Sequence, residues 1–197
     1  MDKQILTPFN KVIEAIDKLN AEDPNLEFSE GQEIPKELLY SQRMTSQLNS
    51  FETEASLELQ IAARAQHICR WKIPRQSYPM NRVGYLTWRE DLKKMHADLT
   101  GSILREFHYK QGFIDRVQFL IKKKHIKKDE ESQTLEDVIC LVFLQYYFED
   151  FAAKHDEQKV IDIVQKTWAK MSEKGHSAAL KLPLSSIALE LVGKALA

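Results

Sequence analysis

The sequence predicts an all-α fold: a single compact helical domain over residues 1–197, with about seven or eight helices around a buried central helix. Apolar residues recur at helical spacing along most of the chain, whereas no segment alternates convincingly between apolar and polar residues as a half-buried strand does. The six prolines and six glycines fall mostly between these periodic segments. We therefore expect helices joined by loops, without an internal repeat or a long linker.

Helix boundaries follow from apolar spacing and from local start and stop signals. Pro35, after the polar loop AEDPNLEFSEGQEIP, suits the first turn of a helix, and Thr87 with Glu90 has the form of a capping box. Pro74 and Pro79 end the third helix and open a stretch of irregular turns. The predicted helices are residues 9–19, 36–51, 54–71, one that begins at Thr87, and 113–127, 133–153, 156–172 and 186–195.

The central helix is predicted from LEDVICLVFLQYYF, which is apolar around most of its circumference. The apolar run over residues 138–148 is interrupted too early to span a membrane, and the start MDKQILTPFN lacks the apolar run of a signal peptide. Cys69 and Cys140 are too few for a disulfide framework, so we expect reduced core cysteines in a cytoplasmic protein.

Charge is nearly balanced, with 28 basic against 29 acidic residues. No overall field therefore favours a nucleic-acid duplex or an anionic membrane as a partner. Any basic binding site has to be local.

One segment, ARAQHICRW, carries a histidine between two arginines and beside a tryptophan. On a helical wheel His67 lies with Arg64 and Trp71, opposite an apolar face. Two interpretations stay open. The face is either a solvated surface with a half-covered tryptophan, or the wall of a cleft that the following loop covers with Arg75 and Tyr78.

Two more polar residues lie on otherwise apolar faces. His96 belongs to a stripe with Trp88 and Leu92, where it is either a satisfied core histidine or a ligand. Asp137 opens the central helix, where an ionised carboxylate needs a cation, a metal or hydrogen-bond donors. Its alternative role is to interact favourably with the helix dipole from the first turn.

Basic residues flank the same segments. Guanidinium groups match phosphate or carboxylate oxygens with paired hydrogen bonds, although solvation of a helical surface is the commoner role of a charge. The residues concerned are Arg64, Arg70, Arg75, Arg89, Lys123 and Lys124.

The stretch Lys170-Met171-Ser172-Glu173-Lys174 resembles the lysine-rich nucleotide loop of class I aminoacyl-tRNA synthetases. No His-x-Gly-His element and no strands for a nucleotide-binding sheet accompany it. We interpret it as the end of a helix, with Gly175 as the C-terminal stop.

Nearly the whole chain resembles one family. The segments FNKVIEAIDKLNAEDPN, PKELLYSQRM, LQIAARAQHICRWKIPRQSYPM, GYLTWR, LEDVICLVFLQYYFEDFAAKHDEQK and KTWAKMSEKGH are similar to the domain of unknown function 4202 family. More remotely, they resemble the His-Asp phosphohydrolases, the HD superfamily, whose all-helical fold holds a metal centre. That resemblance implies an HD-like fold.

The HD resemblance also implies a ligand set. Gln66 and His67 stand where the His-Asp pair belongs, His96 matches an additional histidine, and Asp137 matches the later aspartate. The first histidine is missing, since LLYSQRM offers only Tyr40, Ser41 and Gln42 there, none of them a strong transition-metal ligand. What remains is one divalent metal ion held by His67, His96 and Asp137, with Glu58 or Glu136 as an outer carboxylate.

The predicted function is therefore to act on, or to bind, a phosphorylated small molecule or nucleotide. A metal-assisted phosphohydrolase, a non-catalytic phosphometabolite-binding domain and a protein-interaction scaffold are the three classes that stay open. Catalysis is assigned to His67, His96, Asp137 and Glu136. Substrate binding is assigned to Arg64, Arg70, Trp71, Arg75, Tyr78, Arg89, Lys123 and Lys124.

Overall fold

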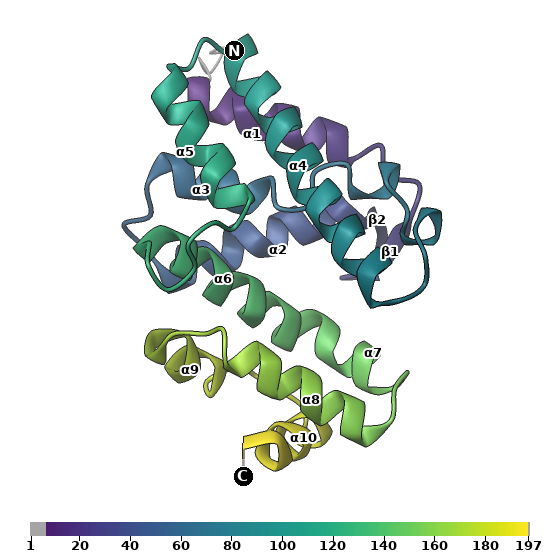
Figure 1. The fold of residues 1–197 in the computed structure, drawn as a ribbon. Helices are drawn as coiled ribbons and strands as arrows, with labels where there is room; N and C mark the ends of the chain where they lie inside the picture. Colours follow the sequence, from purple (N-terminus) through teal and green to yellow (C-terminus); the bar gives the residue numbers. More distant parts are fainter. Residues whose placement is uncertain (1–6, 197) are drawn as a thin grey trace. The chain divides into compact units, whose positions relative to one another are not determined.

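A computed structural model describes residues 7–196, so residues 1–6, where the sequence shows no signal-peptide run, and residue 197 lie outside the description. Ten α-helices and one short hairpin make up the described chain (Figure 1). The prediction of an all-α fold is confirmed. Within residues 7–196, no helix is long and apolar enough to cross a membrane.

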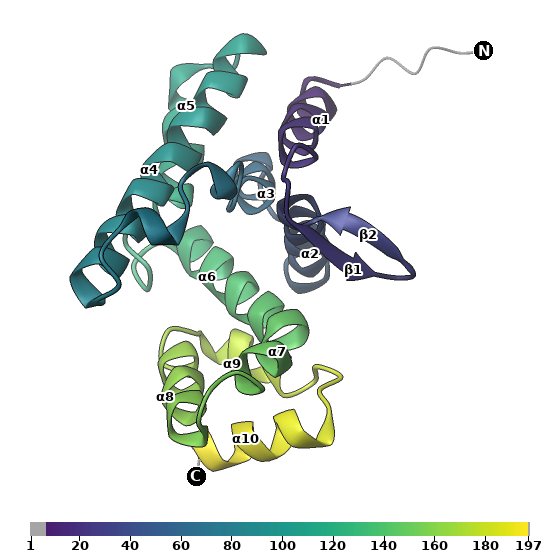
Figure 2. The same cartoon turned by 90° about the vertical axis from the view of Figure 1, so that its right-hand side faces the viewer.

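The regular elements follow one another as helices, apart from the hairpin near the N-terminus (Figure 2). The chain also contains two 3₁₀ turns, Arg70–Lys72 and Arg75–Ser77, and one π-helical segment, Phe143–Tyr147. The bounds are α1 Pro8–Asn20, β1 Leu26–Ser29, β2 Gln32–Pro35, α2 Lys36–Phe51, α3 Leu57–Arg64, α4 Arg82–Glu106, α5 Gln111–Ile121, α6 Glu130–Val142, α7 Phe148–Ala152, α8 Glu157–Trp168, α9 Glu173–Ala179 and α10 Ser186–Leu196.

The chain divides into two units by its own packing. Within the described residues, the first unit is residues 7–46 with Glu54–Lys124, and the second is Gln47–Thr53 with residues 125–196. Helix α2 contributes residues to both. The single domain expected from the sequence stays a prediction.

In the first unit, α1, α3, α4 and α5 pack on one another. Side chains such as Val12, Ile16, Leu59 and Leu104 are almost fully buried there. Helices α4 and α5 approach closely at Gly101, where an added Cβ would come within 2.5 Å of the Gln118 side chain.

In the second unit, one apolar cluster joins α6, the π-helical segment, α7, α8, α9 and α10. Its members include Leu141, Phe148 and Val164, which are at most 1% exposed. The helix predicted as the central one thus supplies much of the core of this unit, and it continues into a π-helical segment after Val142.

The hairpin corrects the expectation of a polar loop before α2. Leu26–Ser29 pairs antiparallel with Gln32–Pro35. Glu30 and Gly31 between them both have positive φ values, 51° and 85°, which is the backbone of a tight type I′ turn. Four-residue strands carry too few alternating positions for the sequence pattern to reveal them.

Other corrections concern helix ends. The helix expected over residues 54–71 ends at Arg64, and residues 65–69 form turns that finish with Cys69 in the left-handed region at φ 54°. Helix α4 begins at Arg82, five residues before the expected Thr87, because Asn81 caps it by accepting from the Gly84 N–H. Gly175 lies inside α9 and does not end a helix.

Candidate functional site

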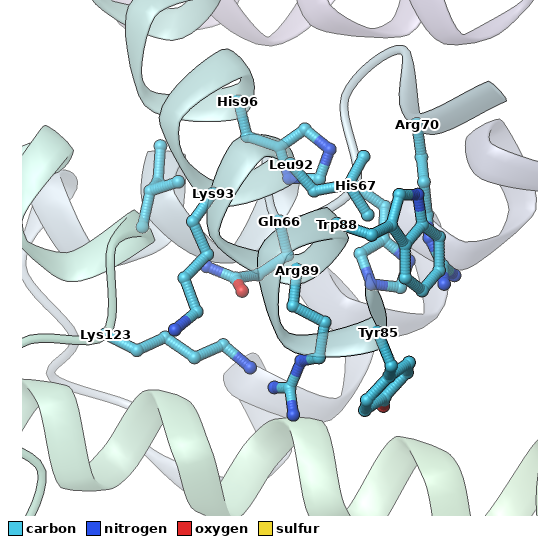
Figure 3. Close-up of a pocket in the computed structure, with 11 residues that line it drawn as sticks. Gln66, His67, Arg70, Tyr85, Trp88, Arg89, Leu92, Lys93, His96 and Lys123 are labelled. Carbon is cyan, nitrogen blue, oxygen red and sulfur yellow. The ribbon is translucent and has the colours of Figure 1, made fainter. Parts of the chain in front are cut away.

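A pocket of about 80 Å³ lies in the first unit (Figure 3). Three segments form its walls: one face of α4, the turns after α3, and the C-terminal end of α5. The lining residues are Gln66, His67, Arg70, Tyr85, Trp88, Arg89, Leu92, Lys93, His96, Ile121 and Lys123.

Helix α4 supplies six of these residues at successive intervals of three, one, three, one and three positions, which places them on one face of the helix: Tyr85, Trp88, Arg89, Leu92, Lys93 and His96. The start of this helix is fixed against the preceding loop. An added Cβ at Gly84 would lie 2.1 Å from the Pro79 carbonyl oxygen, so only glycine fits there. The Trp88 indole N–H also donates to the Ile73 carbonyl at 2.8 Å.

The turns after α3 supply Gln66, His67 and Arg70. The backbone of Cys69 lies in the left-handed region, and its N–H donates to the Asn20 side-chain oxygen at 3.0 Å. This contact to α1 holds the turns in place. Since the helix stops at Arg64, the face expected to join His67 with Arg64 and Trp71 does not form.

His67 is held between three side chains. Its ring stacks on the Tyr40 ring with centroids 3.9 Å apart, and its Nδ1 lies 3.2 Å from Oε2 of Glu37. The His96 ring centroid is 6.1 Å from that of His67. The two histidines therefore sit in one pocket, with the Nε2 side of His67 free of the Glu37 contact.

His96 is almost completely buried, at 3% exposure. A backbone hydrogen bond with Gln66 engages the imidazole, whereas the buried Nε2 has no hydrogen-bond partner within the described chain. A buried, unpaired ring nitrogen costs free energy unless a ligand or water supplies a partner. This nitrogen is the kind of atom that a bound molecule would satisfy.

Burial and positive charge keep both imidazoles neutral. Burial lowers the pKa of His67 well below its usual value, and the charges of Arg70, Lys123, Lys36 and Arg89 lower it further. Burial likewise lowers the pKa of His96, followed by the charges of His67 and Arg70. Burial raises the pKa of Glu37 to about 7, against the opposing charges of Arg70 and Lys36.

The pocket is strongly cationic. Arg70, Arg89, Lys93 and Lys123 line it, and none of its lining residues carries a carboxylate. In Figure 3 the side chains of Arg89, Lys93 and Lys123 extend toward the same part of the pocket. Lys93 forms an ion pair with Glu90 at 2.6 Å, whereas the described part of the chain shows no salt bridge to Arg70 or Arg89. Four cationic side chains around one cavity favour an anion.

Five of the residues predicted from the sequence meet in this pocket. They are His67, His96, Arg70, Arg89 and Lys123.

The other predicted binding residues do not line it. Both oxygens of Asp17 accept from the Arg64 guanidinium, at 2.7 and 2.6 Å, so Arg64 is a buried structural residue. Arg75 donates to three backbone carbonyls of its own loop, and the Tyr78 hydroxyl donates to Asp91. Trp71 is half-buried outside the pocket, and Lys124 is exposed.

Asp137 belongs to the second unit, where its carboxylate is fully engaged. Oδ1 accepts from the Ser172 N–H at 2.8 Å and from the Gln133 side chain at 3.1 Å, and Oδ2 accepts from the Ser172 hydroxyl at 2.5 Å. Ser172 in turn caps α9. Glu136 is also buried, with its carboxylate 3.7 Å from the Lys170 ammonium. Both acidic residues thus have partners within this unit.

The implied divalent metal does not fit these donors well. Two imidazoles are suitable ligands, but the carboxylate that would complete the set is bonded to Ser172, and four cationic side chains surround the imidazoles. Among residues 7–196, no three His, Cys, Asp or Glu side chains are grouped to hold a metal ion. An anion matches the charge of this pocket better than a cation does.

Sequence reasoning missed Glu37, Tyr85, Lys93 and the pocket role of Trp88. The signal for Tyr85 and Lys93 was present, because both extend the stripe of Trp88, Arg89, Leu92 and His96 at helical spacing. Nothing in the sequence pattern pairs Glu37 with His67, which is 30 positions away.

A family model described as a domain of unknown function (DUF4202) matches residues 10–192. The match includes every residue that lines the pocket. No curated protein and no solved structure matches the chain. The description of the family assigns no activity, so function has to be argued from the pocket.

Proposed function

The chain belongs to the domain of unknown function 4202 family, and from its pocket we propose that it binds a phosphorylated small molecule or nucleotide by the phosphate group. The observation that carries the proposal is the convergence of Arg70, Arg89, Lys93 and Lys123 on a cavity without a lining carboxylate. Guanidinium and ammonium groups are the side chains that proteins use to bind phosphate.

The size of the pocket suits this ligand. A cavity of about 80 Å³ is several times the roughly 10–15 Å³ that a cavity needs to hold one water molecule, so it admits a group of a few heavy atoms such as one phosphate. Arg70 is oriented by the Trp88 ring, over which its guanidinium carbon lies at 5.0 Å. The remote resemblance to the His-Asp phosphohydrolases, which act on phosphoryl groups, adds support.

Calorimetric titration with inorganic phosphate tests the proposal. Arg70→Ala and Arg89→Ala should each weaken phosphate binding by about 10- to 100-fold, the loss expected for one charged hydrogen bond. Arg105→Ala is the matched control, because Arg105 lies on the same helix α4 but is exposed outside the pocket. Absence of binding to the wild-type protein, or an equal loss in all three variants, would contradict the proposal.

Hydrolysis of the bound phosphate ester is the second candidate. The observation that favours it is the pair of neutral imidazoles, His67 and His96, beside the cations. The buried Nε2 of His96 has no hydrogen-bond partner within the described chain. A neutral imidazole is suited to accept a proton from an attacking water. Release of inorganic phosphate from phosphate monoesters, with and without added divalent cations, measures this activity. Loss of release in both His67→Ala and His96→Ala would support it, and release unchanged by both variants would exclude these histidines.

A further inference from the structure

The pocket leaves most of a phosphorylated ligand outside. Its volume of about 80 Å³ admits the phosphate but is well below the roughly 300–1,000 Å³ of pockets that enclose a whole small molecule, so the remainder of the ligand extends through the mouth. Among the lining residues, Tyr85 is the one open to solvent there. It is 43% exposed, whereas the neighbouring Trp88 is only 8% exposed. The ring of Tyr85 is therefore the aromatic surface that the rest of the ligand meets first.

This ring lies beside side chains that are themselves anchored. Its centroid lies 5.9 Å from that of Trp88, which is anchored to the Ile73 carbonyl. The Arg75 guanidinium lies 6.0 Å from the Tyr85 ring and is itself held by the carbonyls of Tyr78, Pro79 and Asn81. Neighbours that already restrict an aromatic ring reduce the side-chain entropy that the ring loses when it binds a partner.

One side chain connects the ring to the phosphate site. The guanidinium carbon of Arg89 lies over the Tyr85 ring, 5.8 Å from its centroid, and Arg89 also lines the cationic pocket (Figure 3). A phosphate bound by Arg89 would thus lie next to the tyrosine ring. A planar group joined to that phosphate by a short linker, such as a sugar, could then reach the ring.

We propose that Tyr85 is a stacking platform for a planar aromatic group attached to the phosphate, so that the pocket selects nucleotides and similar aromatic phosphate esters over sugar phosphates. This inference rests on the proposed phosphate binding and specifies the substrate class. Any nucleotide base can stack on an aromatic side chain, and the stacking supplies appreciable affinity. A sugar phosphate lacks a π-face with which to use this ring.

Titrations with inorganic phosphate, ribose 5-phosphate and adenosine monophosphate separate the contributions. The wild-type protein should bind adenosine monophosphate about 10-fold more tightly than ribose 5-phosphate, as expected for one stacked base. Tyr85→Ala should remove that difference and leave the affinity for inorganic phosphate unchanged. Tyr85→Phe keeps the ring and should keep the preference. Tyr146→Ala, an exposed tyrosine of the second unit, is the matched control.

The outcomes distinguish this inference from the proposed function. If inorganic phosphate does not bind the wild-type protein, the proposed function fails and the platform fails with it. If phosphate binds but adenosine monophosphate gains nothing over ribose 5-phosphate, or keeps its advantage in Tyr85→Ala, only the platform is wrong. Thermal unfolding of each variant confirms that the substitution leaves the protein folded.

Discussion

Glu37 links the pocket to the stability of the protein. The residue is 6% exposed, its carboxylate lies 3.2 Å from His67 Nδ1, and burial raises its pKa from the ordinary value of 4.5 to about 7. The folded protein therefore binds more protons at Glu37 than the unfolded chain does between these two pH values. Stability contributed by this group falls as the pH rises from about 4.5 to about 7.

Replacement of Glu37 by glutamine should remove this dependence. Relative to wild type, the Glu37→Gln variant should gain about 1–3 kcal/mol in free energy of unfolding as the pH rises through that window, since one pKa unit corresponds to about 1.4 kcal/mol. Urea unfolding at a series of pH values measures it. The lowered pKa values of His67 and His96 make both proteins less stable as the pH falls below 6.5, so the difference between them reports Glu37 together with its contact to His67. Glu33→Gln, at an exposed site, is the control, and a constant difference across the range would contradict the assignment.

Asp137 is predicted to stabilise the fold through its hydrogen bonds to Ser172. Asp137→Ala leaves the Ser172 hydroxyl and N–H without their buried acceptor and should lower the free energy of unfolding by about 2–4 kcal/mol. Asp150→Ala, at an exposed position of α7, should change it by less than about 0.5 kcal/mol. A loss of phosphate binding in a stable Asp137→Ala protein would show that the carboxylate has a ligand role after all.

At the scale of elements, the first turn of α4 positions the pocket. Gly84→Ala places a methyl group 2.1 Å from the Pro79 carbonyl, and the clash should cost about 1–3 kcal/mol and displace Tyr85, Trp88 and Arg89. Phosphate affinity should fall with stability. Gly112→Ala is the matched control, because nothing lies within 4 Å of the added carbon and alanine favours the helix by up to about 1 kcal/mol. Equal effects of the two substitutions would mean that the Pro79 contact does not set the position of α4.

The sequence predicted correctly those helix boundaries that depend on neighbouring residues. Helix α2 runs over Lys36–Phe51, as its apolar spacing and the preceding proline indicate. The predicted end of α3 was wrong because the turns after this helix depend on a distant contact. The Cys69 N–H donates to Asn20, which lies 49 positions earlier in the chain. Arg64 was interpreted as a binding residue for the same reason, since its partner Asp17 is 47 positions away.

The candidate site was predictable only in part. His96 stood out as a polar residue within an apolar stripe, and Arg89 as a charge on its flank. The convergence of these residues with His67 and Lys123 arises from the packing of α3 and α4 against α5, which no sequence spacing encodes.

For the whole molecule, a single domain predicts one cooperative unfolding transition, although the chain packs as two units. Helix α2 belongs to both units, which favours cooperativity. In a Trp168→Phe variant, fluorescence comes from Trp71 and Trp88 in the first unit, while far-UV circular dichroism reports helices of both. The two signals should share one midpoint in urea. Separate midpoints would show that the units unfold independently.

The central claim is that the His67–His96 pocket binds phosphate, and nuclear magnetic resonance of histidine-labelled protein tests it most directly. During a phosphate titration, the side-chain resonances of His67 and His96, which line the pocket, should shift and saturate together. Those of His155 and His176, which bond to backbone carbonyls in the second unit, should stay in place. Shifts confined to His155 and His176 would contradict the account. So would a saturating phosphate concentration that leaves the His67 and His96 resonances unchanged.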